Sequence, residues 1–348
     1  LFQMLRLLKY LFFLKSSIKS IPIILLDLSP APYLIILGNI IDKIIFNSQN
    51  FGISVLIGVL LSTLYCFKGG FKSIINTDKY QFFFMFLGFF LMTIYILLYY
   101  DYGFEKLSII ISNNPKLFTI PGNSGWTYII SWGFLAILTF IDPSFHQRTF
   151  ASKNKFEIKK GIRISILCWS IFDIMTLFCG LYAINMGPEA PYISLAGKLF
   201  ADIPILEAIF IIGILAVIMS TIDSYTFLSA ITIGKDLRNT FNKDYNQNHI
   251  NWGFFISIII SLIIILFFDN TRISNIWFKF GSYMVSSLLI PFILILLNIR
   301  VKYPFMLISL PIILTILLDF GNIGYEILMY PGLGLSIVLG LTLKDRTK

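Results

Sequence analysis

The sequence predicts an all-α polytopic membrane protein, and three observations carry that prediction. First, 57% of the 348 residues are apolar and only 13% are charged, whereas about 25% of the residues of a soluble domain are charged. Second, the apolar residues gather in runs long enough to cross a bilayer. Third, the basic residues gather in alternate loops between those runs. A water-soluble protein needs more polar side chains to cover its exterior, so soluble enzymes, disordered proteins and secreted disulfide-rich proteins are excluded.

Ten apolar runs are candidates for membrane-spanning helices, since one span needs about 20 mainly apolar residues. Pro30 and Pro32 interrupt the first run, and the second run is barely long enough. The sixth run exceeds a single span, so we expect it to tilt or to extend into the aqueous layer. In chain order, the runs cover roughly 22–47, 52–67, 77–100, 124–141, 160–186, 203–233, 251–269, 273–298, 303–320 and 325–342.

Alternate loops differ sharply in positive charge. One set of loops holds 21 of the 27 lysine and arginine residues, and the loops between them hold 4. Because basic loops stay in the cytoplasm, the sequence predicts that the first set and the C-terminus are cytoplasmic. The alternation also supports the two weakest helices, since dropping either one alone would break it. The basic loops are 1–21, 68–79, 142–163, 234–250, 299–303 and 342–348.

The placement of the charges argues against nucleic acid as a partner, although the net charge is +9. The sequence has no basic face interleaved with aromatic residues. His146 and His249 have no second ligand at a spacing suited to a transition metal. No Ser/His/Asp arrangement, phosphate-binding loop or His-Glu-x-x-His motif occurs in the sequence. We therefore expect no catalytic residue, no cofactor and no transition-metal site.

The richest group of polar residues at membrane depth lies in the sixth run. At 100° per residue, Val217, Ser220, Thr221, Asp223 and Ser224 share one arc of a helix. A charged group at this depth costs roughly 2.5–3.5 kcal/mol on insertion scales, so its presence needs a reason. Hard oxygen ligands of this kind suit a small cation such as sodium. The alternative is a contact between helices through the hydroxyl groups, with Asp223 reaching cytoplasmic water.

Other charged residues inside the apolar runs have separate explanations. Asp173 lies in the middle of its run without a nearby cation, so its partner is either a residue of another helix or a proton. It is a candidate for coupling or for a structural role. Asp42 and Lys43 are expected to satisfy each other or to extend outward to water, and Lys279 is expected to extend outward.

Three loops have a defined character. Thr77 or Asp78 is positioned to cap the helix that follows, where the first backbone N–H groups lack partners. Asp142 and Arg148 are expected to organise the next basic loop through a cap and a salt bridge. The loop at 187–202 is expected to contain a short interfacial helix.

Four stretches carry specific motifs. The strongest is Met219–Ser224, which reads Met-Ser-Thr-Ile-Asp-Ser and is followed by a Lys-Asp pair at 235–236. Tyr65–Gln81 contains Tyr-x-x-x-Gly-Gly and then Thr-Asp-x-x-Gln, and Asp142–Arg148 reads Asp-x-x-x-x-Gln-Arg. The fourth stretch is Gly281–Pro291, which begins Gly-Ser-Tyr and ends in a proline. In this order and spacing, the stretches resemble the sodium:solute symporter family, which includes the sodium/glucose cotransporters, the sodium/proline permease and the sodium/pantothenate permease.

The resemblance implies a LeuT-type fold with two inverted five-helix repeats, within a single transmembrane domain that covers 1–348. Residues 1–100 then form the end of the first repeat, 124–298 the second repeat, and 303–342 two peripheral helices. Because the chain opens on Leu1 in an apolar stretch, we expect it to be truncated at the N-terminus and to lack the first core helices.

The resemblance also implies secondary active transport, in which sodium entry drives uptake of a small organic solute across the inner (cell) membrane. In the family's sodium site, the backbone carbonyl ligand corresponds to Val217 and the hydroxyl pair to Ser220 and Thr221. Asp78 corresponds to a carboxylate on the cytoplasmic exit route of sodium. The implied partners are the solute, the sodium ion as coupling ion, and the lipid bilayer.

Three alternative functions stay open. Asp223 and Ser224 are assigned to the ion pathway, but Asp173 or Asp223 would be the titrating group in a proton-coupled or sensor-like member of the same fold. An integral-membrane acyl or glycosyl transferase is less favoured, because the interfacial charges are scattered rather than clustered beside a groove. The polar arc argues against a purely structural membrane component. No pattern identifies the solute or the oligomeric state, since the first core helix would supply much of the substrate site.

Overall fold

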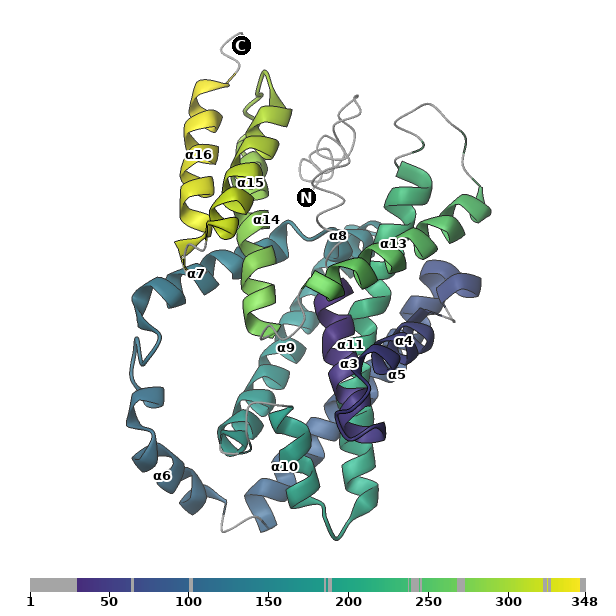
Figure 1. Cartoon of the computed structure of the whole chain (residues 1–348), viewed down its shortest axis with the longest axis vertical. Coiled ribbons are helices and arrows are strands. Elements are labelled where there is room, and N and C mark those ends of the chain that lie inside the picture. The colour runs from purple at the N-terminus through teal and green to yellow at the C-terminus, as the bar shows by residue number, and fades with distance from the viewer. Residues whose placement is uncertain are drawn as a thin grey trace. The chain divides into compact units, whose positions relative to one another are not determined.

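Each of the ten expected apolar runs coincides with a helix in the computed structural model (Figure 1). The structure describes residues 30–344 except 64–65, 100–102, 185, 187–189, 237, 239–243, 245, 268–272, 322–323 and 325–326. Residues 22–29 of the first expected run therefore lie outside the described residues. The ten helices are α3 (Pro30–Ile45), α4 (Phe51–Thr63), α5 (Cys66–Tyr99), α7 (Gly125–Ile137, continued by the 3-10 turn η2, Leu138–Phe140), α9 (Lys155–Ala183), α11 (Pro204–Ile231), α13 (Gln247–Phe267), α14 (Ile273–Leu296), α15 (Pro304–Phe320) and α16 (Met329–Thr342).

Shorter helices occupy several connecting segments. The helix expected within 187–202 is confirmed as α10 (Pro191–Leu199), which begins with a proline at its first position. The apolar runs gave no indication of α6 (Phe104–Asn113) or α8 (Pro143–Phe150), because both are too short and too polar to show a membrane pattern. The remaining short elements are η1 (Pro115–Phe118) and the π-helical segment η3 (Thr232–Asp236).

The helices have the length and the apolar exterior of a multi-pass membrane protein. On α9, the side chains of Ile166, Leu167, Ile174 and Leu177 are each more than 60% exposed. Such a surface is stable against acyl chains and costly against water. Helices long and apolar enough to cross a membrane lie at Gly70–Tyr99, Gly125–Thr149, Lys155–Ala183, Pro204–Lys235, Gln247–Leu266 and Asn275–Leu296, and shorter apolar helices lie at Phe51–Ser62, Pro304–Phe320 and Met329–Thr342.

Helix α5 begins earlier than its apolar run indicates, and this changes the role of Thr77. The helix runs from Cys66, with one break in helical geometry at Gly70, where φ is 55° and ψ is −152°. Glycine reaches this left-handed φ without a Cβ clash, so the chain changes direction there and the helix resumes. Thr77 therefore lies inside the helix, where its hydroxyl donates to the carbonyls of Ser73 and Ile74. The predicted cap by Thr77 or Asp78 is wrong.

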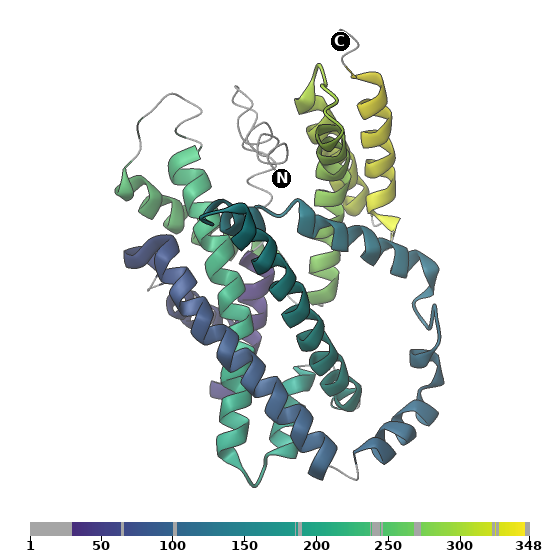
Figure 2. The ribbon, with the colours of Figure 1, turned by 180° about the vertical axis from the view of Figure 1, so that it is seen from behind.

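The chain divides into two compact units, which we call unit A and unit B. Of the described residues, unit A comprises those within 33–123 and 147–224, and unit B comprises those within 30–32, 124–146 and 225–344. In unit A, α5 packs along α9, as the two opposite views show (Figures 1 and 2). An aromatic core fixes this packing, since the ring of Phe89 lies edge-on at 5.1 Å from the rings of both Phe172 and Phe210.

In unit B, α14, α15 and α16 form a three-helix bundle (Figure 1). Lys279 of α14 pairs with Asp319 of α15 at 2.8 Å, and the hydroxyl of Tyr283 donates to the same carboxylate at 2.5 Å. The sequence indicated no partner for Lys279, and α15 brings a carboxylate to it from 40 residues away. The ion pair also satisfies Asp319 near the end of an apolar helix.

Asp42 and Lys43 in unit A have separate partners. Asp42 accepts a hydrogen bond of 2.8 Å from the backbone N–H of Asn50, and so stabilises the start of α4. Lys43 donates to the hydroxyl of Ser194 on α10 at 2.7 Å. Among the described residues, the expected mutual pairing of Asp42 and Lys43 is not found.

Candidate ion site

Two glycines set the distance between α5 and α11 in unit A. A Cβ atom on Gly213 would lie 2.9 Å from the backbone oxygen of Phe84, and a Cβ atom on Gly88 would lie 3.3 Å from that of Ile209. The two backbones are therefore nearly in contact, as small residues allow between membrane helices. This crossing brings the polar segment of α5 beside the segment 217–224 of α11.

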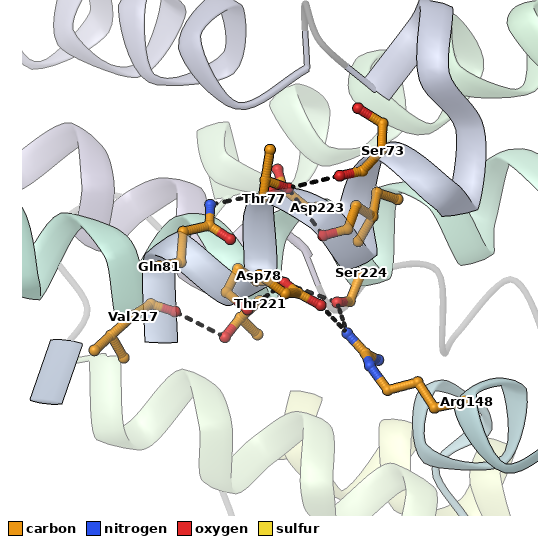
Figure 3. A network of polar contacts seen from close by, with 11 residues as sticks. Ser73, Thr77, Asp78, Gln81, Arg148, Val217, Thr221, Asp223 and Ser224 are labelled. Carbon is orange, nitrogen blue, oxygen red and sulfur yellow. Dashed lines mark hydrogen bonds and ion pairs between the residues drawn. The ribbon is translucent and has the colours of Figure 1, made fainter. Parts of the chain in front are cut away.

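Asp78 of α5 is the centre of the resulting polar network (Figure 3). Its Oδ1 accepts a hydrogen bond of 2.8 Å from the hydroxyl of Ser220, which is 142 residues away in the sequence. Its Oδ2 forms an ion pair of 3.0 Å with Nη2 of Arg148 on α8. The carboxylate is thus engaged by a hydroxyl on one oxygen and by a cation on the other.

Arg148 connects the carboxylate to a second hydroxyl. The same Nη2 atom that contacts Asp78 lies 2.8 Å from Oγ of Ser224 (Figure 3). The expected salt bridge of Arg148 forms with Asp78 rather than with Asp142. Asp142 instead accepts from the backbone N–H of Ser144 at 2.8 Å, which confirms its predicted role as a cap, and from the hydroxyl of Tyr225 at 2.7 Å.

The carbonyl and the hydroxyls predicted to hold sodium lie along one side of α11. The hydroxyl of Thr221 donates to the carbonyl of Val217 at 3.1 Å, and that of Ser224 donates to the carbonyl of Ser220 at 2.9 Å. The side chains of Val217, Ser220, Thr221 and Ser224 are half-buried. This side of the helix therefore carries backbone and hydroxyl oxygens next to the carboxylate of Asp78.

Asp223 joins the same network from a buried position. Its side chain has no exposed surface, and its Oδ2 accepts a hydrogen bond of 3.4 Å from Nε2 of Gln81. The alternative in which Asp223 reaches cytoplasmic water does not match this burial. Gln81 follows Asp78 by three residues, a spacing that places both on one face of α5.

Asp173 takes no part in the network. It lies on the exposed apolar face of α9, and within the described residues its carboxylate has no hydrogen-bond or ion-pair partner. Only its backbone carbonyl is engaged, by the hydroxyl of Thr176 at 3.0 Å. The structure therefore does not bring Asp173 together with the other predicted ion-pathway residues.

The chemistry of the network is that of hard oxygen ligands and one cation. Carboxylate, carbonyl and hydroxyl oxygens are the ligands that bind sodium, magnesium and calcium rather than softer metals. Among the described residues, no group of three His, Cys, Asp or Glu side chains is placed to hold a metal ion. The one cation of the network is the guanidinium of Arg148, which pairs with the carboxylate of Asp78.

Sequence reasoning gave Arg148 and Gln81 no place in the site. Gln81 had a usable signal, because it shares a helix face with Asp78. Arg148 belongs to the Asp-x-x-x-x-Gln-Arg motif, but that motif does not indicate its partners. Arg148 is 70 residues from Asp78 and 76 from Ser224, and only the folded chain brings these residues together.

One similar protein is the High-affinity proline transporter PutP of Bacillus subtilis (strain 168). The two sequences are 25% identical over 267 residues, an alignment that covers 70% of this chain and 56% of that transporter. The chain therefore spans little more than half the length of this curated relative.

The sodium:solute symporter family matches residues 37–302. The matched segment contains every residue of the network, from Asp78 on α5 through Arg148 on α8 to Ser224 on α11. Because the match extends over more than half of the sequence and agrees with the helical, multi-pass architecture, the chain belongs to the sodium:solute symporter family.

Proposed function

We propose that this protein is a secondary active transporter that couples sodium entry to the uptake of a small organic solute across the cell membrane. The observation that carries the proposal is the 2.8 Å contact between the Ser220 hydroxyl and the Asp78 carboxylate. It places a negative charge next to the hydroxyl and carbonyl oxygens of α11, inside a chain of otherwise apolar helices. Carboxylate, hydroxyl and carbonyl oxygens gathered in this way suit a small cation such as sodium.

The proposed sodium ligands are the carbonyl oxygen of Val217 and the hydroxyl oxygens of Ser220 and Thr221. The hydroxyl of Thr221 lies 3.1 Å from the Val217 carbonyl, so the two oxygens are close enough to share one cation after the hydroxyl turns. Asp78, and with it Asp223 and Ser224, would form the pathway by which the ion leaves toward the cytoplasm. Carboxylates beside a hydroxyl site lower the energy of a passing cation by direct Coulomb attraction.

The solute is proposed from the similar transporter alone. PutP is named as a transporter of proline, so proline is the first solute to test, with other small amino acids after it. Symport then requires that sodium and solute together stabilise one conformation more than either does alone.

The test is uptake of radioactive proline by the full natural protein in proteoliposomes. We expect uptake to follow an inward sodium gradient and to stop when potassium replaces sodium on both sides. Uptake driven equally well by a proton gradient without sodium would contradict sodium coupling and would favour the proton-coupled alternative, with the buried Asp223 as the titrating group. Sodium-driven uptake of another small solute, but not of proline, would retain the coupling and replace the solute.

The orientation of the chain is proposed from the charge pattern and leads to a separate prediction. The loop at 142–163 belongs to the basic set, so we expect it to face the cytoplasm. In a background without Cys66, Cys168 and Cys179, Ser152→Cys should react with an impermeant thiol reagent only after the cells are permeabilised. Ser112→Cys, which is exposed on α6, should react in intact cells. Reaction at position 152 in intact cells would contradict the orientation.

A further inference from the structure

The carboxylate of Asp78 lies next to both Arg148 and a proposed sodium ligand. One oxygen of that carboxylate pairs with Arg148 at 3.0 Å, and the other is 2.8 Å from Oγ of Ser220, a proposed sodium ligand. We propose that Arg148 is a tethered cation that competes with sodium for Asp78, so that it lowers sodium affinity and speeds sodium release to the cytoplasm. This inference rests on the proposed function and adds a positioning residue to it.

The competition follows from charge and distance. A cation bound to the Ser220 hydroxyl would lie close to the Asp78 carboxylate, because the hydroxyl itself is 2.8 Å from Oδ1 of Asp78. The guanidinium of Arg148 occupies the other oxygen of the same carboxylate. Two cations near one carboxylate share its attraction and repel each other, and in a partly buried place this repulsion is screened less than in water. The side chain of Asp78 is only 22% exposed. Sodium therefore binds more weakly while Arg148 remains on Asp78.

The position of Arg148 suits a group that moves away and returns. Its side chain is 37% exposed, more than that of its partner, and it projects from α8, a helix of only eight residues. A single nitrogen, Nη2, makes both the contact with Asp78 and the contact with Ser224. When the Arg148 side chain withdraws, Oδ2 of Asp78 becomes available to a sodium ion. When the side chain returns, it replaces the departing ion next to Asp78.

Two changes in opposite directions follow from this arrangement. Without the guanidinium, Asp78 keeps its full charge for sodium, so sodium should bind more tightly. For the same reason the ion should leave more slowly, and the maximal rate of uptake should fall. A residue that merely supports the fold would weaken binding and uptake together.

The experiment is equilibrium binding of radioactive sodium to the purified full natural protein, followed by uptake in proteoliposomes. Arg148→Gln should bind sodium at least about fivefold more tightly, the lower end of common coupling between sites, and should have a lower maximal uptake rate. Arg148→Lys should resemble the wild type, because an ammonium group also offers donors to both acceptors. Arg163→Gln is the matched control: it removes the same charge from an exposed position of α9 and should change neither quantity.

Further outcomes separate the inference from the proposed function. If the wild type binds sodium and Arg148→Gln does not bind it more tightly, the inference is overturned and sodium coupling stands. If Arg148→Gln tightens sodium binding by the same factor in an Asp78→Asn background, the guanidinium acts through its general electric field and not by competition for Asp78. That result also overturns the inference. If Arg148→Gln does not fold, Arg148→Met removes the same guanidinium from Asp78, and a sodium affinity that does not rise in that variant overturns the inference. A wild type that binds no sodium refutes the proposed function itself.

Discussion

Replacing Thr221 with alanine is expected to raise the sodium concentration for half-maximal uptake about tenfold. Its hydroxyl lies 3.1 Å from the carbonyl of Val217 on the side of α11 that faces Asp78, and it is one of three proposed oxygen ligands. Losing one ligand should cost at least about 1.4 kcal/mol, which corresponds to the tenfold change. The maximal uptake rate at saturating sodium should change less, because the remaining ligands still define the site. The measurement is solute uptake in proteoliposomes over a sodium series.

Thr226→Ala is the matched control for this prediction. Thr226 is on the same helix and only 3% exposed, so its replacement also removes a buried hydroxyl but leaves the proposed ligands intact. Sodium dependence should stay at the wild-type value, even if the thermal stability of the protein falls. Equal shifts in the two variants would mean that Thr221 contributes only to helix packing.

Asp78→Asn is expected to reduce sodium-dependent uptake at least about tenfold and to weaken sodium binding. The substitution removes the charge that faces both Ser220 and Arg148. Truncating one partner of a hydrogen-bonded charge pair costs about 2–5 kcal/mol when the pair is buried, and less here because both side chains are partly exposed. We therefore expect a cost below that range, about 1.4 kcal/mol, which corresponds to a tenfold loss.

The sign of the Asp78→Asn effect is also informative. Sodium affinity should fall in Asp78→Asn and rise in Arg148→Gln, because the carboxylate attracts the ion and the guanidinium competes with it. Asp202→Asn is a suitable control, since it removes one carboxylate from an exposed position before α11. Wild-type uptake by Asp78→Asn would remove Asp78 from the ion pathway.

The helices and the polar arc follow from local rules, and that is why the sequence predicts them. A membrane span is defined by the length and apolarity of a continuous run, so all ten runs coincide with helices. The arc on α11 follows from the 100° turn per residue, which applies wherever the helix packs. The boundary of α5 was missed because a single glycine with a positive φ allows the helix to resume after a break.

The partners of charged side chains could not be predicted, because they come from distant parts of the chain. Arg148 has Asp142 six residues away, and the nearer carboxylate was the reasonable choice from sequence. In the structure a capping interaction occupies Asp142, and Arg148 of α8 pairs with Asp78 of α5 instead. Lys279 and Asp319 repeat this pattern over 40 residues. Helical periodicity predicts which residues share one side of a helix, but it does not predict which other helix packs against that side.

The most direct test of the central claim is a titration of the purified protein with radioactive sodium in a potassium buffer. The account predicts saturable sodium binding by the wild type, about tenfold weaker binding by Thr221→Ala, and wild-type binding by Thr226→Ala. Binding with the same affinity in all three proteins, or no saturable binding in any of them, would contradict the assignment of sodium to Val217, Ser220 and Thr221.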